Sequence, residues 1–153
     1  MAENGVEVRL ADGEAELEAA KELRLRVFSV EQGVPREHEI DGLDPGATQL
    51  VAVRRGKVVG TCRLRFPRGR CKLERMVVDP ALRHTGVGRM LAAAAEREAR
   101  RQGVEEIILH AQRRVEDFYA ACGYAPEGDT FLEEGIPHVR MRKRIDAAQQ
   151  LSA

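Results

Sequence analysis

The chain has 153 residues, enough for one domain with a sizeable core. Its 25 basic and 25 acidic residues balance, so net charge gives no argument for a nucleic-acid or anionic-membrane partner. The aromatic content of 4%, with no tryptophan, also disfavours a surface that stacks nucleic-acid bases.

Targeting and metal-binding signals are not visible in the sequence. The first ten residues lack the basic start and apolar core of a signal peptide. The longest apolar run, Met90 to Ala95, is too short to cross a bilayer. Cys62, Cys71 and Cys122 match no Cys or Cys/His metal spacing. We therefore expect no metal, and free thiols in a reducing, cytoplasmic setting.

Strand-like and helix-like patterns alternate in the N-terminal part. Residues 6 to 10 alternate apolar with polar side chains, which predicts a short strand. Apolar residues recur at helical spacing from Glu14 to about Val30, which predicts a helix. Residues 31 to 46 carry many acids and are expected to form a loop or a broken second helix.

A hairpin and a central strand are predicted next. The apolar runs 50 to 54 and 57 to 66 are separated by Arg55-Gly56, which is a hairpin signal. Cys71 to Val78 has apolar residues on both alternation faces, which is typical of a central strand covered on both sides.

Residues 83 to 89, RHTGVGR, separate that strand from a helix predicted from Met90 to Gln102. Glycines allow a tight turn, and the first N–H groups of a helix have no intrahelical partner. Such a turn is typical of a phosphate site. A dinucleotide fold would instead place G-x-G-x-x-G after the first strand of a βαβ unit, and no Walker loop is present.

The C-terminal part completes the element pattern. Residues 106 to 111 predict a buried strand, 114 to 122 a helix, and 138 to 142 a last strand. Tyr124 onward is expected to be loop or strand, and 146 to 153 a frayed tail. Strands and helices are mixed within one unit, so we expect a single domain over residues 1–145 of the α/β or α+β class.

Two of these stretches together resemble the GNAT superfamily of N-acetyltransferases. Residues 83 to 88, RHTGVG, match its Q/R-x-x-G-x-G/A acetyl-CoA signature. Residues 118 to 124, FYAACGY, resemble its F-Y-x-x-x-G-F element after the fifth strand. Stretches 27–32, 39–44 and 135–141 further resemble the bacterial ElaA/YjcF-like subgroup. One departure is Thr48-Gln49, where that subgroup leads us to expect a histidine.

The resemblance implies a GNAT-type mixed, mostly antiparallel sheet of about seven strands with about four helices, splayed between strands 4 and 5. It also implies transfer of an acetyl group from acetyl-CoA to a primary amine by direct attack in a ternary complex. A non-catalytic acetyl-CoA sensor on the same fold, or a transferase for another acyl-CoA, are the alternatives. Both a monomer and a homodimer are compatible with the sequence.

The expected cofactor site combines the turn with the strand before it. Backbone groups of Met76 to Val78 are placed to pair with the pantetheine arm as an added strand, although their side chains would serve a core equally well. The expected contacts of acetyl-CoA are Met76, Val77, Val78, Arg83, His84, Thr85, Gly86, Val87, Gly88, Arg89, Gln112, Phe118 and Tyr119. Arg113 lies beside Gln112 and is a further candidate.

Tyr119 and Glu74 are the expected catalytic residues. A phenol near the thioester sulfur can protonate the leaving thiolate, although Tyr119 also lies on the apolar stripe of its helix. A lysine-like amine is mostly protonated near pH 7, so a base is needed. Glu74 alternates with Met76 and Val78 and is expected to face an apolar surface. It would act directly or through water, or else be a structural carboxylate.

Acids between residues 31 and 44 are expected to form a rim that attracts a cationic amine, although a solvated loop gives the same pattern. Its candidate acceptor-binding residues are Glu31, Glu37, Glu39 and Asp41, with His138 from the end of the chain. Glu31 is also a second candidate base.

Overall fold

The computed structural model describes residues 5–145. Its contacts divide the chain into two compact units. Unit 1 comprises Met1–Arg65 and Arg75–Ala95, and unit 2 comprises Phe66–Glu74 and Glu96–Ala153. The tail predicted at 146–153 lies outside the described residues.

The strands form a seven-stranded mixed sheet in the order β1-β2-β3-β4-β5-β7-β6. They are β1 (Glu7–Leu10), β2 (Thr48–Arg54), β3 (Lys57–Arg65), β4 (Cys71–Val78), β5 (Glu106–Gln112), β6 (Ala125–Glu133) and β7 (Ile136–Arg144). The α-helices of the described residues are α1 (Gly13–Leu25), α2 (Arg36–Glu39), α3 (Val87–Arg101) and α4 (Glu116–Ala121). The predicted class, strand number and helix number are confirmed.

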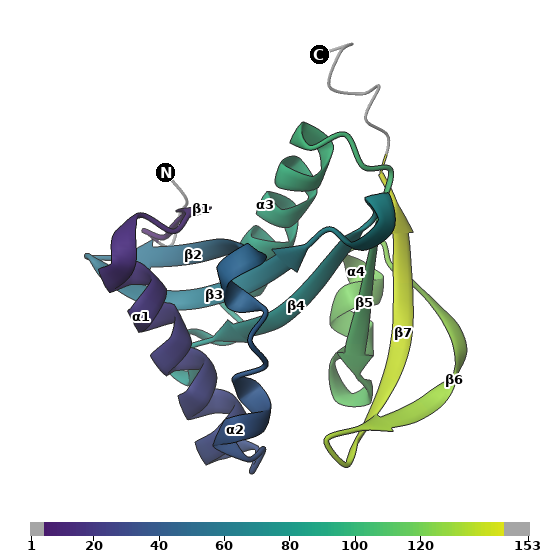
Figure 1. The fold of residues 1–153 in the computed structure, drawn as a ribbon, viewed down its shortest axis with the longest axis horizontal. Coiled ribbons are helices and arrows are strands. Elements are labelled where there is room, and N and C mark those ends of the chain that lie inside the picture. The colour runs from purple at the N-terminus through teal and green to yellow at the C-terminus, as the bar shows by residue number, and fades with distance from the viewer. Residues whose placement is uncertain (1–4, 146–153) are drawn as a thin grey trace. The chain divides into compact units, whose positions relative to one another are not determined.

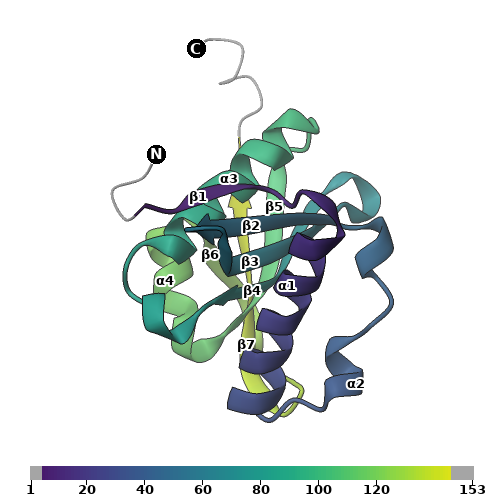
Figure 2. The same cartoon turned by 90° about the vertical axis from the view of Figure 1, so that its left-hand side faces the viewer.

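Unit 1 contains the antiparallel strands β1, β2 and β3, with α1 crossing them (Figure 2). Arg55 (φ 52°) and Gly56 (φ 75°) connect β2 to β3, and two positive φ values in succession match the twist of a two-residue hairpin. The predicted hairpin is therefore confirmed.

Both faces of the unit 1 sheet are covered. Ala20 and Leu23 of α1 pack with Val51, Val58 and Val77 in one buried cluster. On the opposite face the sheet has a glycine, Gly60 of β3. A Cβ there would lie 3.0 Å from a Val87 methyl and 3.1 Å from a Leu91 methyl, so the first turns of α3 approach the sheet closely. Cys71–Val78 was expected to be a central strand covered by other elements. The burial of Val77 in this cluster agrees with that expectation.

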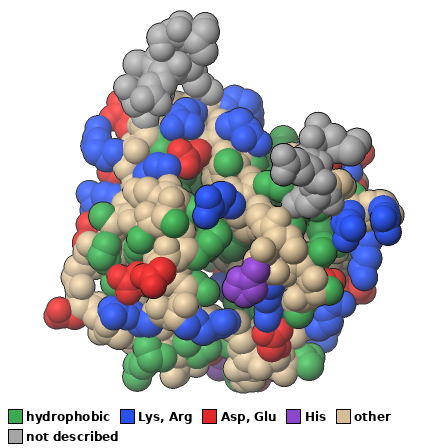
Figure 3. Space-filling view, turned by 180° about the vertical axis from the view of Figure 1, so that it is seen from behind, with side chains coloured by type: hydrophobic (Ala, Val, Ile, Leu, Met, Phe, Trp, Pro, Cys, Tyr) green, Lys and Arg blue, Asp and Glu red, His purple; other side chains and the backbone are tan. Residues whose placement is uncertain are grey.

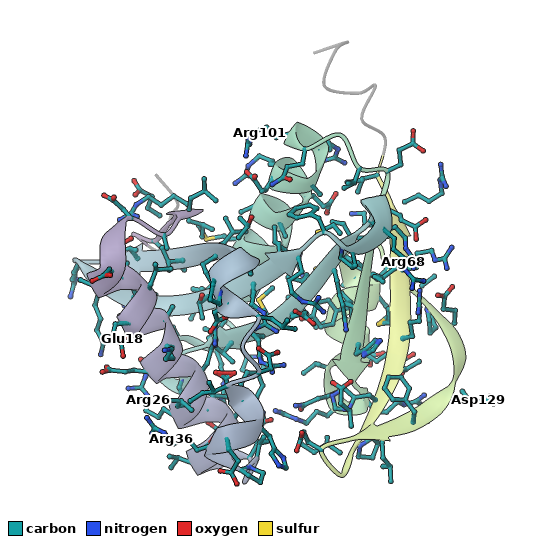
Figure 4. The ribbon with its side chains drawn as sticks, viewed as in Figure 1. Glu18, Arg26, Arg36, Arg68, Arg101 and Asp129 are labelled. Carbon is teal, nitrogen blue, oxygen red and sulfur yellow. The ribbon has the colours of Figure 1, made fainter. Side chains whose placement is uncertain are left out.

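The helix predicted from Glu14 to Val30 consists of two kinds of turn. α1 ends at Leu25 and continues as a π-helix over Arg26–Glu31. The N–H of Gln32 bonds the carbonyl of Val27 at 3.0 Å, which is the i→i−5 pattern. Single π turns inside helices are frequent at functional sites. Glu18 and Arg26 are labelled along this helix in Figure 4.

Unit 2 contains β5, β7 and β6 in antiparallel contact, and the first residues of β4 pair with β5 in parallel (Figure 1). Residues 124 onward, expected to be loop or strand, form the long strand β6. β7 extends beyond the predicted 138–142. The turn between them uses Glu134 (φ 54°) and Gly135 (φ 72°), a second primed hairpin.

A polar network lies inside unit 1. Arg24 of α1 and Arg63 of β3 are only 1% and 0% exposed. The Nε of Arg24 donates to Glu39 at 3.0 Å and its Nη2 donates to Asp44 at 2.7 Å. Arg63 holds Asp41 with two bonds of 2.9 and 2.8 Å. Buried guanidinium groups require such partners, because desolvation without a counter-charge is costly.

Two more side chains complete what we call the arginine–carboxylate network (Arg24, Arg63, Arg75, Glu39, Asp41, Asp44 and Gln49). Arg75 of β4 donates to Glu39 at 2.9 Å and to Asp41 at 3.2 Å. Gln49 donates through Nε2 to Asp44 at 3.0 Å. The residue that departs from the ElaA/YjcF-like pattern therefore has a structural place in this network.

The network predicts a large stability effect at Glu39. Replacing Glu39 with alanine removes a partner from the buried Arg24 and from the partly exposed Arg75, so we expect Glu39→Ala to lower the free energy of unfolding by about 3–5 kcal/mol. Urea unfolding at pH 7 measures this. Glu18→Ala, an exposed change in α1, is the control and should shift stability by no more than about 0.5 kcal/mol. Equal effects of the two variants would contradict the network's role.

The aspartates of the network predict acid sensitivity. Burial acts to raise the pKa of Asp44, but hydrogen bonds from Arg24 and Arg63 outweigh it and bring the pKa to about 2. Hydrogen bonds from Arg63 hold the pKa of Asp41 well below its usual range. The unfolded chain, with an aspartate pKa of about 3.9, then binds more protons. Stability should be fully present above about pH 4 and fall as pH drops toward 2.

Urea midpoints between pH 6 and pH 2.5 test this acid sensitivity. In Asp44→Asn the pH-dependent loss should be smaller than in the parent chain, because the substituted side chain no longer titrates. A parent midpoint that does not change with pH would overturn the assignment.

Candidate functional site

The glycine turn of unit 1 leads directly into α3. Asp79 accepts a hydrogen bond from the N–H of Ala81 at 3.0 Å and starts the turn. Gly86 has φ 96°, a value that favours glycine, and its carbonyl accepts from the N–H of Met90 at 3.0 Å. Gly86 is thus the N-cap of α3. The N–H groups of residues 87–89 have no intrahelical acceptor and lie at the positive end of the helix dipole. This arrangement suits a phosphate group.

Arg83, at the start of the turn, is paired with Glu31. Its Nη1 and Nη2 donate to the two carboxylate oxygens at 2.7 and 2.9 Å. The hydrogen bonds that Arg83 donates to Glu31 raise the pKa of Arg83 above its ordinary value. A residue expected to bind the cofactor and one expected near the acceptor are therefore in contact. A phosphate that reached Arg83 would compete with the Glu31 carboxylate for the same N–H groups.

β4 contains a strained residue just before the positions expected to contact pantetheine. Arg75 has φ 55°, which is rare for a non-glycine residue and more so within a strand. Its guanidinium is held by Glu39 and Asp41, so the network supplies the contacts that maintain this conformation. The Val77 side chain is buried in the core of unit 1. A cofactor contact at Val77 would therefore involve its backbone.

Tyr119 is buried in an aromatic group of unit 2. It is 7% exposed. Its ring makes edge contacts with Phe118 at 4.9 Å and with Tyr124 at 5.9 Å between centroids. Burial raises the pKa of the neighbouring Tyr124 phenol. The apolar-stripe position expected for Tyr119 is confirmed, and its catalytic role stays a prediction.

Glu74 has a charged neighbour. Its carboxylate lies 3.3 Å from the Lys72 ammonium, and its side chain is 10% exposed. Glu74 therefore faces a lysine and not only the apolar surface expected from its alternation with Met76 and Val78.

His138 of β7 belongs to a group that the sequence did not reveal. Glu133 of β6 lies between two histidines, with Oε1 at 2.9 Å from His110 Nδ1 and Oε2 at 3.7 Å from His138 Nε2. The ring of Phe131 contacts both imidazoles. His110 interrupts the otherwise apolar run from Ile107 to Ala111 in β5, which is the one sequence signal for it. Glu133 is in the hairpin that sequence patterns left undefined.

The acidic segment is only partly available to a ligand. Glu37 is exposed on α2. Glu39, in contrast, is 2% exposed and shared between Arg24 and Arg75, so the expectation that it belongs to an exposed rim was wrong. Asp41 is bonded to Arg63 and Arg75. Glu39 and Asp41 are unavailable to a ligand because arginines from other elements of unit 1 neutralise their charges.

Gln112 and Arg113 have partners within unit 2. Gln112 accepts from the Nε of Arg114 at 2.9 Å. Arg113 donates to the Thr130 hydroxyl at 3.1 Å and lies 3.3 Å from Glu116. On the face drawn in Figure 3, basic, acidic and apolar side chains are intermingled, in keeping with the balanced composition.

Within residues 5–145, no group of His, Cys, Asp and Glu side chains has an arrangement that would hold a metal ion. No helix in that part of the chain has the length and apolar character needed to span a membrane.

Comparison with known proteins gives a consistent result. A family model described as an acetyltransferase (GNAT) domain matches residues 14–145. The uncharacterized N-acetyltransferase YjcF of Bacillus subtilis (strain 168) is 38% identical over 135 residues, which cover 88% of this chain and 96% of YjcF. The crystal structure of an acyl-CoA N-acyltransferase from Pseudomonas aeruginosa superposes with a TM-score of 0.81 at 32% identity, covering 90% of this chain and 99% of that one.

The crystal structure of Escherichia coli ElaA also has a TM-score of 0.81, at 25% identity, covering 90% of this chain and 99% of ElaA. Similarity to both YjcF and ElaA confirms the subgroup that residues 27–32, 39–44 and 135–141 indicated. The strand–glycine turn–helix of unit 1 and the FYAACGY stretch of unit 2 thus lie in a chain that belongs to the GNAT family of acetyltransferases, in its ElaA/YjcF-like subgroup.

Proposed function

We propose that this acetyltransferase transfers an acetyl group from acetyl-CoA to a primary amine. The observation that carries the proposal is the turn before α3, where Gly86 caps the helix and three N–H groups, flanked by Arg83 and Arg89, suit a diphosphate. The Pseudomonas aeruginosa relative is named as an acyl-CoA N-acyltransferase, which supports an acyl-CoA donor.

The remaining cofactor contacts are proposed from the family resemblance. In unit 1, the backbone of Met76 to Val78 would pair with the pantetheine amides, and an N–H near Val77 would hold the carbonyl oxygen as it gains charge. His84, Thr85, Val87 and Gly88 belong to the phosphate turn. In unit 2, Gln112, Phe118 and Tyr119 are the proposed contacts.

Two residues of unit 2 are proposed for proton transfer. The acceptor amine attacks the thioester carbon directly, and the C–S bond breaks with its electron pair going to sulfur. Tyr119 donates a hydrogen bond or proton to that sulfur, so that thiol leaves instead of thiolate. Glu74 is a candidate for proton removal from the amine, directly or through water.

The acceptor is proposed to be a cationic amine. Glu37, exposed on α2, remains available to attract it, and Glu31 becomes available if Arg83 turns to a phosphate. His138 remains a proposed acceptor-side residue of unit 2. The three cysteines are free thiols, which suits the reducing cytoplasm.

Tyr119→Phe tests the proposed acid. We expect a loss of about 100-fold in kcat for acetyl transfer, because a general acid contributes on the order of 10²–10⁴. The measurement is release of CoA thiol with a panel of amines. Tyr124→Phe is the matched control, since Tyr124 lies in the same aromatic group and its buried hydroxyl has no hydrogen-bond partner among the described residues. Equal activity of the two variants would remove Tyr119 from the mechanism.

Glu31→Gln tests the competition at Arg83. Removing the carboxylate frees a guanidinium that is held by a half-exposed ion pair, so we expect CoA to bind up to about fivefold more tightly. Calorimetric titration at low and high salt measures the dissociation constant. Glu18→Gln changes the net charge by the same amount at an exposed site of unit 1, and it should leave the dissociation constant of CoA unchanged. Weaker CoA binding by Glu31→Gln would show instead that Glu31 positions Arg83 for the phosphate.

A further inference from the structure

Ionisable side chains from β4, β5 and β7 share one face of the unit 2 sheet. Lys72 of β4 is the register partner of Ile108 of β5, so Lys72 and Glu74 share a face with Ile108 and His110. Across β5, His110 is the partner of Arg140, and Gln112 is the partner of His138. The opposite face of β5 consists of the buried residues Ile107, Leu109 and Ala111.

His110 and Glu133 form a dyad with a defined proton position. A carboxylate can only accept, so the 2.9 Å contact places a hydrogen on His110 Nδ1. The neutral ring then carries its lone pair on Nε2, as in histidines that act as general bases. The hydrogen bond from His110 lowers the pKa of Glu133, with the charges of His110, His138 and Lys72 adding to the effect, so the carboxylate stays ionised near neutral pH.

His138 has a different arrangement from His110. Its Nδ1 donates to the carbonyl of Ile136 at 2.7 Å, and its side chain is 8% exposed. It stacks on Phe131 with centroids 5.9 Å apart. His138 therefore supports one side of Glu133, whereas His110, with 26% of its side chain exposed, is the more exposed of the two imidazoles.

We propose that Nε2 of His110 removes the proton from the acceptor ammonium, with Glu133 as the residue that positions the ring. The proposal rests on the proposed function, because it assigns a step of amine acetylation. The N–H bond of the ammonium breaks as an N–H bond forms at Nε2, and the electron pair remains on the amine nitrogen for attack. The imidazolium later releases its proton to water.

The neighbours favour His110 over Glu74 for this step. An imidazole, with a reference pKa of about 6.5, is a stronger base than a carboxylate of about 4.3. Glu74 is also 3.3 Å from the Lys72 ammonium, which competes with the substrate for it. In this assignment Glu74 helps to attract the ammonium, and water-mediated removal at Glu74 becomes the competing outcome of the test.

Charged groups from three strands face His110 and set the pH dependence. Glu133 from β6 and Glu74 from β4 favour the imidazolium, whereas Lys72 from β4, Arg140 from β7 and a protonated His138 oppose it. Arg140 is engaged by Glu127 at 2.8 Å. Removing the Glu133 charge should therefore move the acidic limb of the activity profile to lower pH.

The experiment uses the full chain, acetyl-CoA and two peptides. One peptide has only a lysine amine, with a pKa of about 10.4, and the other only an α-amine, with a pKa of about 7.7–8.0. His110→Asn keeps an N–H near the Nδ1 position for Glu133 but has no Nε2. We expect it to lower kcat/KM for the lysine peptide about 100-fold at pH 7. The loss in kcat/KM for the lysine peptide should shrink toward pH 10, because free amine is then present. The loss at pH 7 should be smaller for the α-amine peptide, because more of that amine is already unprotonated.

Glu133→Gln should move the acidic limb of kcat/KM to lower pH, and Asp129→Asn, an exposed change on the same strand, should not. The proposal is overturned if His110→Asn loses the same fraction of kcat/KM at every pH. It is also overturned if His110→Asn keeps full activity while Glu74→Gln is inactive. If the parent chain acetylates neither peptide, the proposed function fails for these amines. Nitrogen-15 NMR of the His110 ring then decides the dyad. An Nδ1–H tautomer in the parent chain that is lost in Glu133→Leu, which has no acceptor, supports the dyad. A ring that is unchanged by Glu133→Leu overturns it.

Discussion

The constraint on which unit 1 depends is that two arginines are buried in it. Arg24 and Arg63 have almost no exposed surface, and each needs a carboxylate to compensate for lost hydration. The carboxylates come from the short segment that contains α2 and the turn after it. That segment is mostly exposed and has few apolar side chains directed inward. Its position is therefore fixed mainly by charge-assisted hydrogen bonds and not by hydrophobic burial.

The same carboxylates also act on β4. Arg75 has a backbone conformation that costs on the order of 1–3 kcal/mol, and such strain persists only where surrounding contacts maintain it. Glu39 and Asp41 provide those contacts through the guanidinium. A single network in unit 1 thus holds the acidic segment and shapes the strand that leads into the glycine turn. Substitutions in the acidic segment can be expected to affect the strand even where they touch no ligand.

The features that the sequence predicted are those set by local chemistry. The hairpin at Arg55-Gly56 and the capped turn before α3 follow from glycine positions and from alternation over a few residues. β6 was not defined, because its residues are mostly exposed and polar and its pairing depends on β7. The role of Glu39 was misread for a related reason. A run of acids has the same composition whether it faces solvent or three arginines contributed by distant parts of the chain.

Glu133 of unit 2 has different partners from the carboxylates of the arginine–carboxylate network, and this difference has a chemical consequence. Arginine stays charged at any physiological pH, so the network of unit 1 has fixed charges and can hold structure but cannot exchange protons. In unit 2, Glu133 is paired with histidines, the side chains whose ordinary titration range lies near neutral pH. Since amine acetylation, the proposed function, must dispose of one proton for each turnover, this pairing is the basis for proposing His110 on the β5–β7 face as the group that accepts it. Glu31, the second candidate base that the sequence indicated and the one that lies in unit 1, is already paired with Arg83.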